Sequence, residues 1–117
     1  MNYADIERRL LSEPGAVKEM PFGPSAVVFK VGGKMFALVG WDDEPLRLAL
    51  KCDPEEAEYL RSAFDAVTPA YHMNKRHWND VVLDGSIPPD RLNAMIRHSY
   101  ELVVKGLKKA DREALGM

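Results

Sequence analysis

Hydrophobic and polar positions alternate through the first half of the chain and recur at helical spacing near both ends. The alternation predicts two strands, at 26–31 and 34–39, joined by the pair Gly32-Gly33. Glycine takes the positive φ that both positions of a two-residue hairpin loop require. This part of the chain therefore predicts a tight β-hairpin.

A two-residue loop also fixes which residues of the hairpin lie opposite each other. It places Phe29 opposite Phe36, and an aromatic pair of this kind supports the register. Val27 then lies opposite Leu38 on the same face of the sheet. Because a slip of one residue would turn every side chain to the other face, we expect all four residues to lie under the helices.

Alternation, which is typical of strands, and helical spacing also predict the remaining elements. Further strands are expected at 17–22, 46–51 and 80–83. Helix starts, marked by a capping residue or a proline ahead of apolar positions at helical spacing, are expected at Asn2, Asp53 and Pro89. Strands joined by short turns, with helices before and after them, indicate a single α+β domain over residues 1–117. We expect its helices to cover one face of an antiparallel sheet and to leave the other face partly open to water.

Net charge narrows the range of partners. The 117 residues include 16 Lys and Arg against 18 Asp and Glu, which gives a formal charge of −2. A protein with this balance does not attract nucleic acid as a whole. Any such role must rest on a local patch, because the electrostatic part of the binding grows with the number of phosphates that are neutralised.

Cysteine usage and apolar runs bear on where the protein works. The single cysteine, Cys52, has no partner for an intramolecular disulfide, which is typical of a reducing cytoplasm. It ends an apolar strand, so we expect a packed small residue rather than a reactive thiol. No apolar run is long enough to span a membrane, and the N-terminus lacks the pattern of a signal peptide. These features predict a cytoplasmic protein that does not contact a membrane. We also expect the protein to be a monomer.

The run 71–79 concentrates polar and aromatic chemistry that periodicity does not explain. Lysine and arginine can contact phosphates, asparagine can pair with a base edge, and tryptophan or histidine can stack on bases. We therefore predict a nucleic-acid or anion-binding patch made of His72, Asn74, Lys75, Arg76, His77 and Trp78. A purely structural reading also remains open. In that reading Trp78 and Met73 are core residues, and the two cations belong to a solvated turn.

Spacing disfavours metal binding and catalysis by these residues. His72 and His77 lie five positions apart, which puts them on opposite faces of a strand and far apart around a helix. Cys52 is not surrounded by a pattern typical of a catalytic nucleophile, and the chain has no glycine-rich phosphate loop. We expect no bound metal, no cofactor, and a binding module rather than an enzyme.

Four segments together carry a resemblance to a known family. They are Phe36-Ala37-Leu38, Leu50-Lys51-Cys52-Asp53-Pro54, the run from Thr68 to Asn79, and His98-Ser99-Tyr100-Glu101-Leu102-Val103. Through these segments, which are spread over nearly its whole length, the chain resembles the MmcQ/YjbR family of small bacterial proteins. The resemblance implies a frataxin-like (CyaY-like) α+β architecture. It also implies DNA binding, the function with which the family is often labelled, and it brings no catalytic residue and no iron site.

Two functions therefore remain open for the patch. The first is DNA binding, which the cations and aromatic rings of the run 71–79 favour. The alternative is the binding of a protein or of a small anionic metabolite by the same residues. Aromatic rings and arginine are also enriched at protein interfaces, so composition alone does not decide between the two.

Overall fold

The structure is a computed structural model that describes residues 2–40, 43–70 and 73–117. Its helices are α1 (Tyr3–Leu11), α2 (Pro54–Ala63), α3 (Pro89–Lys105) and α4 (Lys109–Ala114). Its strands are β1 (Val17–Glu19), β2 (Val27–Val31), β3 (Lys34–Gly40), β4 (Arg47–Lys51), β5 (Val67–Pro69) and β6 (Trp78–Val82).

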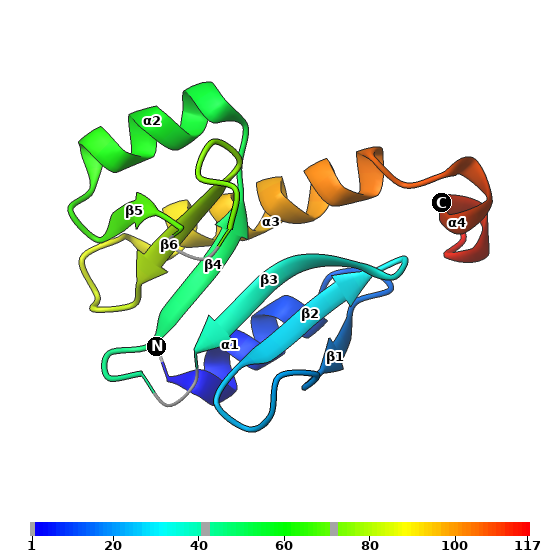
Figure 1. The fold of residues 1–117 in the computed structure, drawn as a ribbon, viewed down its shortest axis with the longest axis horizontal. Coiled ribbons are helices and arrows are strands. Elements are labelled where there is room, and N and C mark those ends of the chain that lie inside the picture. The colour runs from blue at the N-terminus through cyan, green and yellow to red at the C-terminus, as the bar shows by residue number, and fades with distance from the viewer. Residues whose placement is uncertain (1, 41–42, 71–72) are drawn as a thin grey trace.

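The strands form one six-stranded sheet in the order β1-β2-β3-β4-β6-β5, and every neighbouring pair is antiparallel. In Figure 1, α1 and α3 lie behind the sheet, and α2 lies beside its β5–β6 end. Apolar residues of these helices and of the sheet form one core, which includes Ile6 and Leu10 of α1, Leu60 of α2 and Ile96 of α3. The α+β class and the antiparallel sheet predicted from periodicity are confirmed.

Helix starts follow the predicted capping chemistry. The Asn2 side chain accepts a hydrogen bond from the backbone N–H of Asp5 at 2.9 Å, and the Asp5 carboxylate accepts one from the N–H of Asn2 at 3.2 Å. This reciprocal pair satisfies two N–H groups that the first turn leaves without partners. Asp53 caps α2 by accepting a single hydrogen bond from the N–H of Glu55 at 3.1 Å. All three predicted helix starts are confirmed, including that of α3 at Pro89.

The hairpin register departs from the prediction because of a β-bulge. Lys30 pairs with Met35, as a two-residue loop requires, but Phe29 pairs with Ala37 rather than with Phe36. The extra residue on β3 allows Phe36 and Ala37 both to reach the core. The predicted pairing of the two phenylalanines is therefore wrong, although both rings are fully buried.

Beyond the bulge every residue of β3 has changed sides relative to the prediction. Leu38 pairs with Val28, is half-buried and lines a shallow hollow that lies outside the core. Val39 takes the core position instead and is fully buried. The expected place under the helices is confirmed for Phe29, Phe36 and Val27 and is wrong for Leu38.

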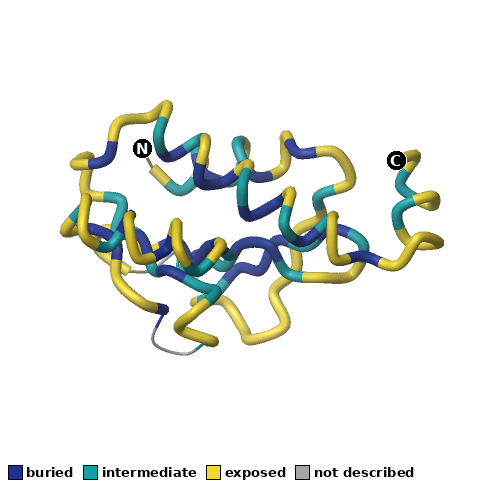
Figure 2. Tube along the Cα trace, turned by 90° about the horizontal axis from the view of Figure 1, so that it is seen from above, coloured by how far each residue is buried: buried dark blue, intermediate teal, exposed yellow. Residues whose placement is uncertain are grey.

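Two short elements were not predicted. β5 has three residues, and α4 has six, too few for either period to be recognised. In Figures 1 and 2 α4 lies at one end of the molecule, beyond the β2–β3 hairpin, and its residues are exposed or half-buried. The chain returns to the body through Leu107 and Leu115, which approach Gly32 and Gly15 respectively. Both glycines have positive φ, and a side chain at either would meet a leucine.

A polar network joins α1 to α3. Glu13, two residues after α1, is only 4% exposed and accepts hydrogen bonds from Arg9 at 2.9 Å and from Arg97 of α3 at 2.5 Å. Arg9 also donates to the Asn93 side chain of α3 at 3.0 Å. Since a buried carboxylate needs such partners, the two helices are held in a fixed relation behind the sheet.

Candidate functional site

The segment 74–77 is a tight turn closed by its own hydrogen bonds. The backbone N–H of His77 donates to the carbonyl of Asn74 at 3.1 Å, which closes the turn. The Asn74 side-chain oxygen accepts from the backbone N–H of Arg76 at 3.0 Å, an arrangement that asparagine commonly stabilises in turns. One acceptor position of this oxygen is thus engaged, and the amide nitrogen of Asn74 is available to recognise a base edge.

Arg61 of α2 fixes the turn to the rest of the protein. Its Nε donates to the Asn79 side-chain oxygen at 2.7 Å, and its Nη2 donates to the backbone carbonyl of Lys75. Asn79 is only 2% exposed, and its amide nitrogen donates to the carbonyl of Ala57 at 3.5 Å. A single guanidinium therefore connects α2, β6 and the turn.

The junction between β4 and α2 is held just as firmly. Three consecutive backbone N–H groups each find a different partner outside their own elements. Lys51 donates to the Ser99 hydroxyl at 2.9 Å, Cys52 to the carbonyl of His77 at 2.7 Å, and Asp53 to His98 Nε2 at 3.2 Å. The turn and α3 are thus both attached to residues 51–53.

The predicted patch residues lie on two sides of this turn. Asn74, His77 and Trp78 line a hollow of about 410 Å³, which they share with Lys51. Lys75 and Arg76 line a second hollow of about 330 Å³ beside α2, together with Arg61. His72 lies outside the described residues. The structure thus divides the five described residues into two adjoining groups.

The structural reading of the run is only partly correct. Trp78 and Met73 are half-buried rather than core residues. Trp78 pairs with Lys51 across the β4–β6 ladder, so their side chains share a face of the sheet. Lys75 and Arg76 are exposed in the turn, as both readings expect.

Replacement of Arg61 by methionine should lower the free energy of unfolding by about 1–3 kcal/mol, because it leaves the buried Asn79 oxygen without a partner. It should also release the turn, which would appear as amide chemical-shift changes across residues 74–77. Urea unfolding with tryptophan fluorescence measures the first effect, and NMR measures the second. Arg8→Met is the matched control, since Arg8 is 76% exposed in a surface ion pair with Asp5 and should change stability by less than about 1 kcal/mol. Equal losses in the two variants would contradict the role of Arg61.

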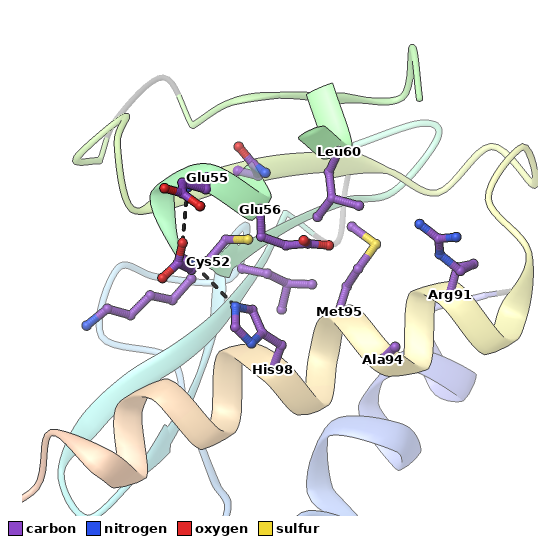
Figure 3. A pocket seen from close by; sticks show the side chains of 12 residues that line it. Cys52, Glu55, Glu56, Leu60, Arg91, Ala94, Met95 and His98 are labelled. Carbon is purple, nitrogen blue, oxygen red and sulfur yellow. Dashed lines mark hydrogen bonds between the residues drawn. The ribbon is translucent and has the colours of Figure 1, made fainter. Parts of the chain in front are cut away.

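A larger cavity that the sequence did not predict lies between α2 and α3. Its volume is about 490 Å³. The helices contribute Glu56 and Leu60 of α2 and Arg91, Met95 and His98 of α3, with the Cys52 thiol at one side (Figure 3). Arg91, Ala94, Met95 and His98 recur at helical spacing, and this recurrence is the signal that a second α3 face faces something other than the sheet.

The surroundings of Cys52 in this cavity do not favour nucleophilic catalysis by its thiol. Burial, first, and then the charges of Glu56 and Asp53 raise the pKa of the Cys52 thiol from 9.0 to about 11. A thiol in this state is neutral at physiological pH and is a poor nucleophile. His98 accepts a hydrogen bond at Nε2 from the backbone N–H of Asp53. Among the described residues, no group of three or more His, Cys, Asp or Glu side chains could hold a metal ion.

The fold defines an α+β protein with an open antiparallel sheet, and comparison with known proteins identifies its family. The family model described as YjbR matches residues 11–102. The chain belongs to the YjbR family, as the resemblance in its sequence had indicated.

Relatives extend the match over nearly the full chain. It is 32% identical to the uncharacterised protein YjbR of Escherichia coli strain K12 over 115 residues, which cover 98% of each chain. It is 39% identical to the uncharacterised protein YbdF of Escherichia coli O157:H7, over 80% of this chain and 76% of that one. A crystal structure of a Deinococcus radiodurans protein of the family-model domain DUF419 superposes with a TM-score of 0.92 at 41% identity, covering 99% of this chain and 88% of that one. These names assign no activity.

Proposed function

We propose that the protein is a nucleic-acid-binding module that uses the turn 74–77. The observation that supports this most directly is the set of hydrogen bonds that position the turn. Backbone hydrogen bonds and Arg61 hold it in place, and Lys75 and Arg76 are exposed. A site that is ordered before binding loses less entropy when its ligand arrives.

The two sides of the turn suit two parts of a nucleotide. The cations Lys75 and Arg76 suit the phosphate, which arginine can contact with two parallel hydrogen bonds. The neighbouring hollow offers Trp78 and His77 for stacking on one base, with Lys51 beside them. A base can enter such a hollow only when it is unpaired. Single-stranded nucleic acid is therefore the preferred ligand within this proposal.

The affinity should be weak. Glu55 and Glu58 line the hollow that contains Lys75 and Arg76, and the chain carries a net charge of −2. Few phosphates can be neutralised by such a patch. We expect a Kd of about 10⁻⁴ to 10⁻⁶ M that rises with salt.

The double variant Lys75→Ala/Arg76→Ala should bind a fluorescein-labelled single strand about tenfold more weakly and should reduce the slope of log K against log salt by about 1.4. Fluorescence anisotropy at several salt concentrations measures both quantities, with a duplex of the same sequence as the second ligand. Lys108→Ala/Lys109→Ala removes the same charge from exposed positions at the start of α4 and serves as the matched control. Equal affinity of the two double variants would contradict the proposal, as would the absence of binding by wild-type protein at low salt.

A specific observation also supports the alternative, a small anionic metabolite or a protein bound at the same patch. The hollow with Lys51, His77 and Trp78 has about the volume of a small-molecule site. NMR titrations with mononucleotides and planar carboxylates would distinguish the alternatives. Saturable shifts with such compounds, in the absence of oligonucleotide binding, would favour the metabolite. The absence of both would leave a protein partner.

The proposal also includes a frataxin-like architecture and a cytoplasmic location. The frataxin-like arrangement is supported by helices that pack on one face of an antiparallel sheet, and superposition on a frataxin structure tests it. A cytoplasmic location is supported by the single free cysteine, and cell fractionation tests it. None of the described helices is long and apolar enough to cross a membrane.

A further inference from the structure

The hollow beside the turn combines hydrogen-bond donors with one strong acceptor, and such a combination can distinguish one base from another. Lys51, Asp53, Asn74 and Trp78 all line this hollow. The ammonium group of Lys51 and the amide nitrogen of Asn74 donate hydrogen bonds, whereas the ionised carboxylate of Asp53 only accepts them. A base that stacks on Trp78 therefore finds both kinds of group in the walls of the same hollow.

The position of Asp53 is set by the start of α2. Its carboxylate accepts from the backbone N–H of Glu55 at 3.1 Å, and its own backbone N–H donates to His98 Nε2 at 3.2 Å. A carboxylate offers about four lone-pair positions, so the capping bond leaves acceptor capacity for a ligand. Because Asp53 is exposed, a ligand can reach the carboxylate without displacing another residue.

Guanine matches this set of groups better than the other bases do. Its pairing edge presents two adjacent donors, N1–H and the N2 amino group, and a carboxylate can accept both in two parallel hydrogen bonds. Its O6 and N7 atoms are acceptors, which suit the Lys51 ammonium and the Asn74 amide. Adenine, cytosine and thymine each present only one donor group on the pairing edge. An unpaired base leaves these edges open to a protein.

We propose that the hollow prefers guanine and that Asp53 is the residue that determines this preference. The Asp53 carboxylate accepts from N1–H and from the N2 amino group of a guanine that stacks on Trp78. Lys51 and Asn74 donate to the acceptor atoms of the same base. The proposal rests on the proposed function, because it names the base that the nucleic-acid site recognises. A guanine in a single strand and a free guanine mononucleotide share these contacts, and the strand adds phosphate contacts at the turn.

The hollow is not isolated from the cavity between α2 and α3. Lys51, Cys52 and Asp53 line both spaces, so a guanine bound by Asp53 lies next to the cavity. Amide shifts alone would not show which of the two spaces holds the base. The test therefore depends on changes to the base and on variants that affect only one of the two spaces.

The test measures fluorescence anisotropy with labelled thymine-rich strands that carry one central guanine, inosine, adenine or cytosine. The guanine strand should bind at least about fivefold more tightly than the adenine and cytosine strands. Inosine lacks only the N2 amino group of guanine, and its strand should lose most of this advantage. Equal affinity of all four strands would overturn the guanine preference and leave the proposed function intact.

Titration of ¹⁵N-labelled protein with guanosine monophosphate separates the two sources of guanine. Saturable shifts with this mononucleotide, without binding of any strand, would contradict the proposed function and retain the guanine site. The absence of binding by both the strands and the mononucleotide would overturn both proposals. Adenosine monophosphate is the matched control and should bind at least about fivefold more weakly than guanosine monophosphate.

Three variants test the role of Asp53. Asp53→Asn should bind the guanine and inosine strands about equally, while the fold is retained because asparagine caps a helix as well as aspartate does. The ratio of the two affinities is the readout, since the loss of a negative charge also raises the affinity for every strand. Asp65→Asn removes the same charge from an exposed position that lines neither hollow beside the turn, and it should keep the preference for guanine.

The third variant, Ala94→Trp, fills the neighbouring cavity, which Ala94 lines from an exposed position on α3. It should keep the wild-type preference for guanine, because Ala94 does not line the hollow beside the turn. A preference that survives in Asp53→Asn would overturn the proposal. A preference that is lost in a folded Ala94→Trp protein would also overturn it, since the base would then lie in the cavity between the helices.

Discussion

Replacement of Ser99 by alanine should lower the free energy of unfolding by about 2–4 kcal/mol, because it removes two hydrogen bonds from a site without access to water. Ser99 lies on α3 and is fully buried. Its hydroxyl donates to the carbonyl of Phe36 at 2.6 Å and accepts from the N–H of Lys51 at 2.9 Å. The β3–β4 ladder ends one step earlier, at the pair of Ala37 and Leu50. The hydroxyl therefore takes the place of the next cross-strand bond.

Urea unfolding of Ser99→Ala against wild type measures this loss. Ser62→Ala is the matched control, since Ser62 is an exposed helical serine whose hydroxyl donates to a carbonyl of its own helix. The control should change stability by less than about 0.5 kcal/mol. Amide exchange at Lys51 should also become faster in Ser99→Ala, because that N–H loses its partner. A Ser99 variant as stable as the control would show that a water molecule or a closer approach of the strands replaces the hydroxyl.

Local chemistry made most of the fold predictable from the sequence. Asn2 and Asp53 marked helix starts because a capping side chain works within its own turn and needs no tertiary partner. The Gly32-Gly33 loop marked the hairpin for the same reason, since positive φ is a property of the residue itself. Capping residues and glycine pairs therefore indicate the same local element whatever the rest of the fold is.

The bulge in β3 could not be predicted in this way. Both registers of the hairpin are compatible with its loop, and both bury Phe29 and Phe36. The choice depends on α3, where Ser99 binds the carbonyl of Phe36 and the Tyr100 ring packs edge-on against the Phe36 ring at 5.5 Å between centres. A residue more than sixty positions away thus decides which of Leu38 and Val39 enters the core.

The two candidate sites also differ in whether local sequence or tertiary packing brings their residues together. The run 71–79 could be selected from the sequence because its polar chemistry is contiguous. The cavity between α2 and α3 could not, because Glu56 and Arg91 become neighbours of one space only when the two helices are placed. Its sequence signal is a second helical stripe on α3, beginning at Arg91, which is too mixed in polarity to resemble an amphipathic face.

The junction at residues 51–53 connects the two candidate sites. Cys52 binds the turn through His77, and Asp53 binds α3 through His98. Neither bond involves a side chain that we assign to a ligand. Any displacement of the junction by a ligand at Asp53 would therefore reach both the turn and α3 through the backbone, so the amide shifts of α3 should also be followed in the binding experiments.

Raising the pH from 9 to 11 should remove about 2 kcal/mol of the stability that Cys52 gives to the folded protein. The pKa of its thiol rises from 9.0 to about 11 on folding, first because the thiol is buried and then because Glu56 and Asp53 lie near it. Between these values the unfolded chain releases the thiol proton while the folded chain keeps it. Deprotonation therefore draws the equilibrium toward the unfolded state, and the contribution is complete below pH 9 and lost as the pH approaches 11.

The quantity to measure is the difference in unfolding free energy between wild type and Cys52→Ala as a function of pH. Tyrosines and lysines titrate in the same range, but their effects are common to both proteins and cancel in the difference. Alkylation by iodoacetamide at pH 8 gives an independent measure, because a difference of about two in pKa makes the thiolate about a hundredfold rarer in the folded protein than in urea. A difference in stability that stays flat from pH 8 to 11, together with equal alkylation rates, would show that the Cys52 thiol is open to solvent and that the cavity beside it is wider and more polar than its lining indicates.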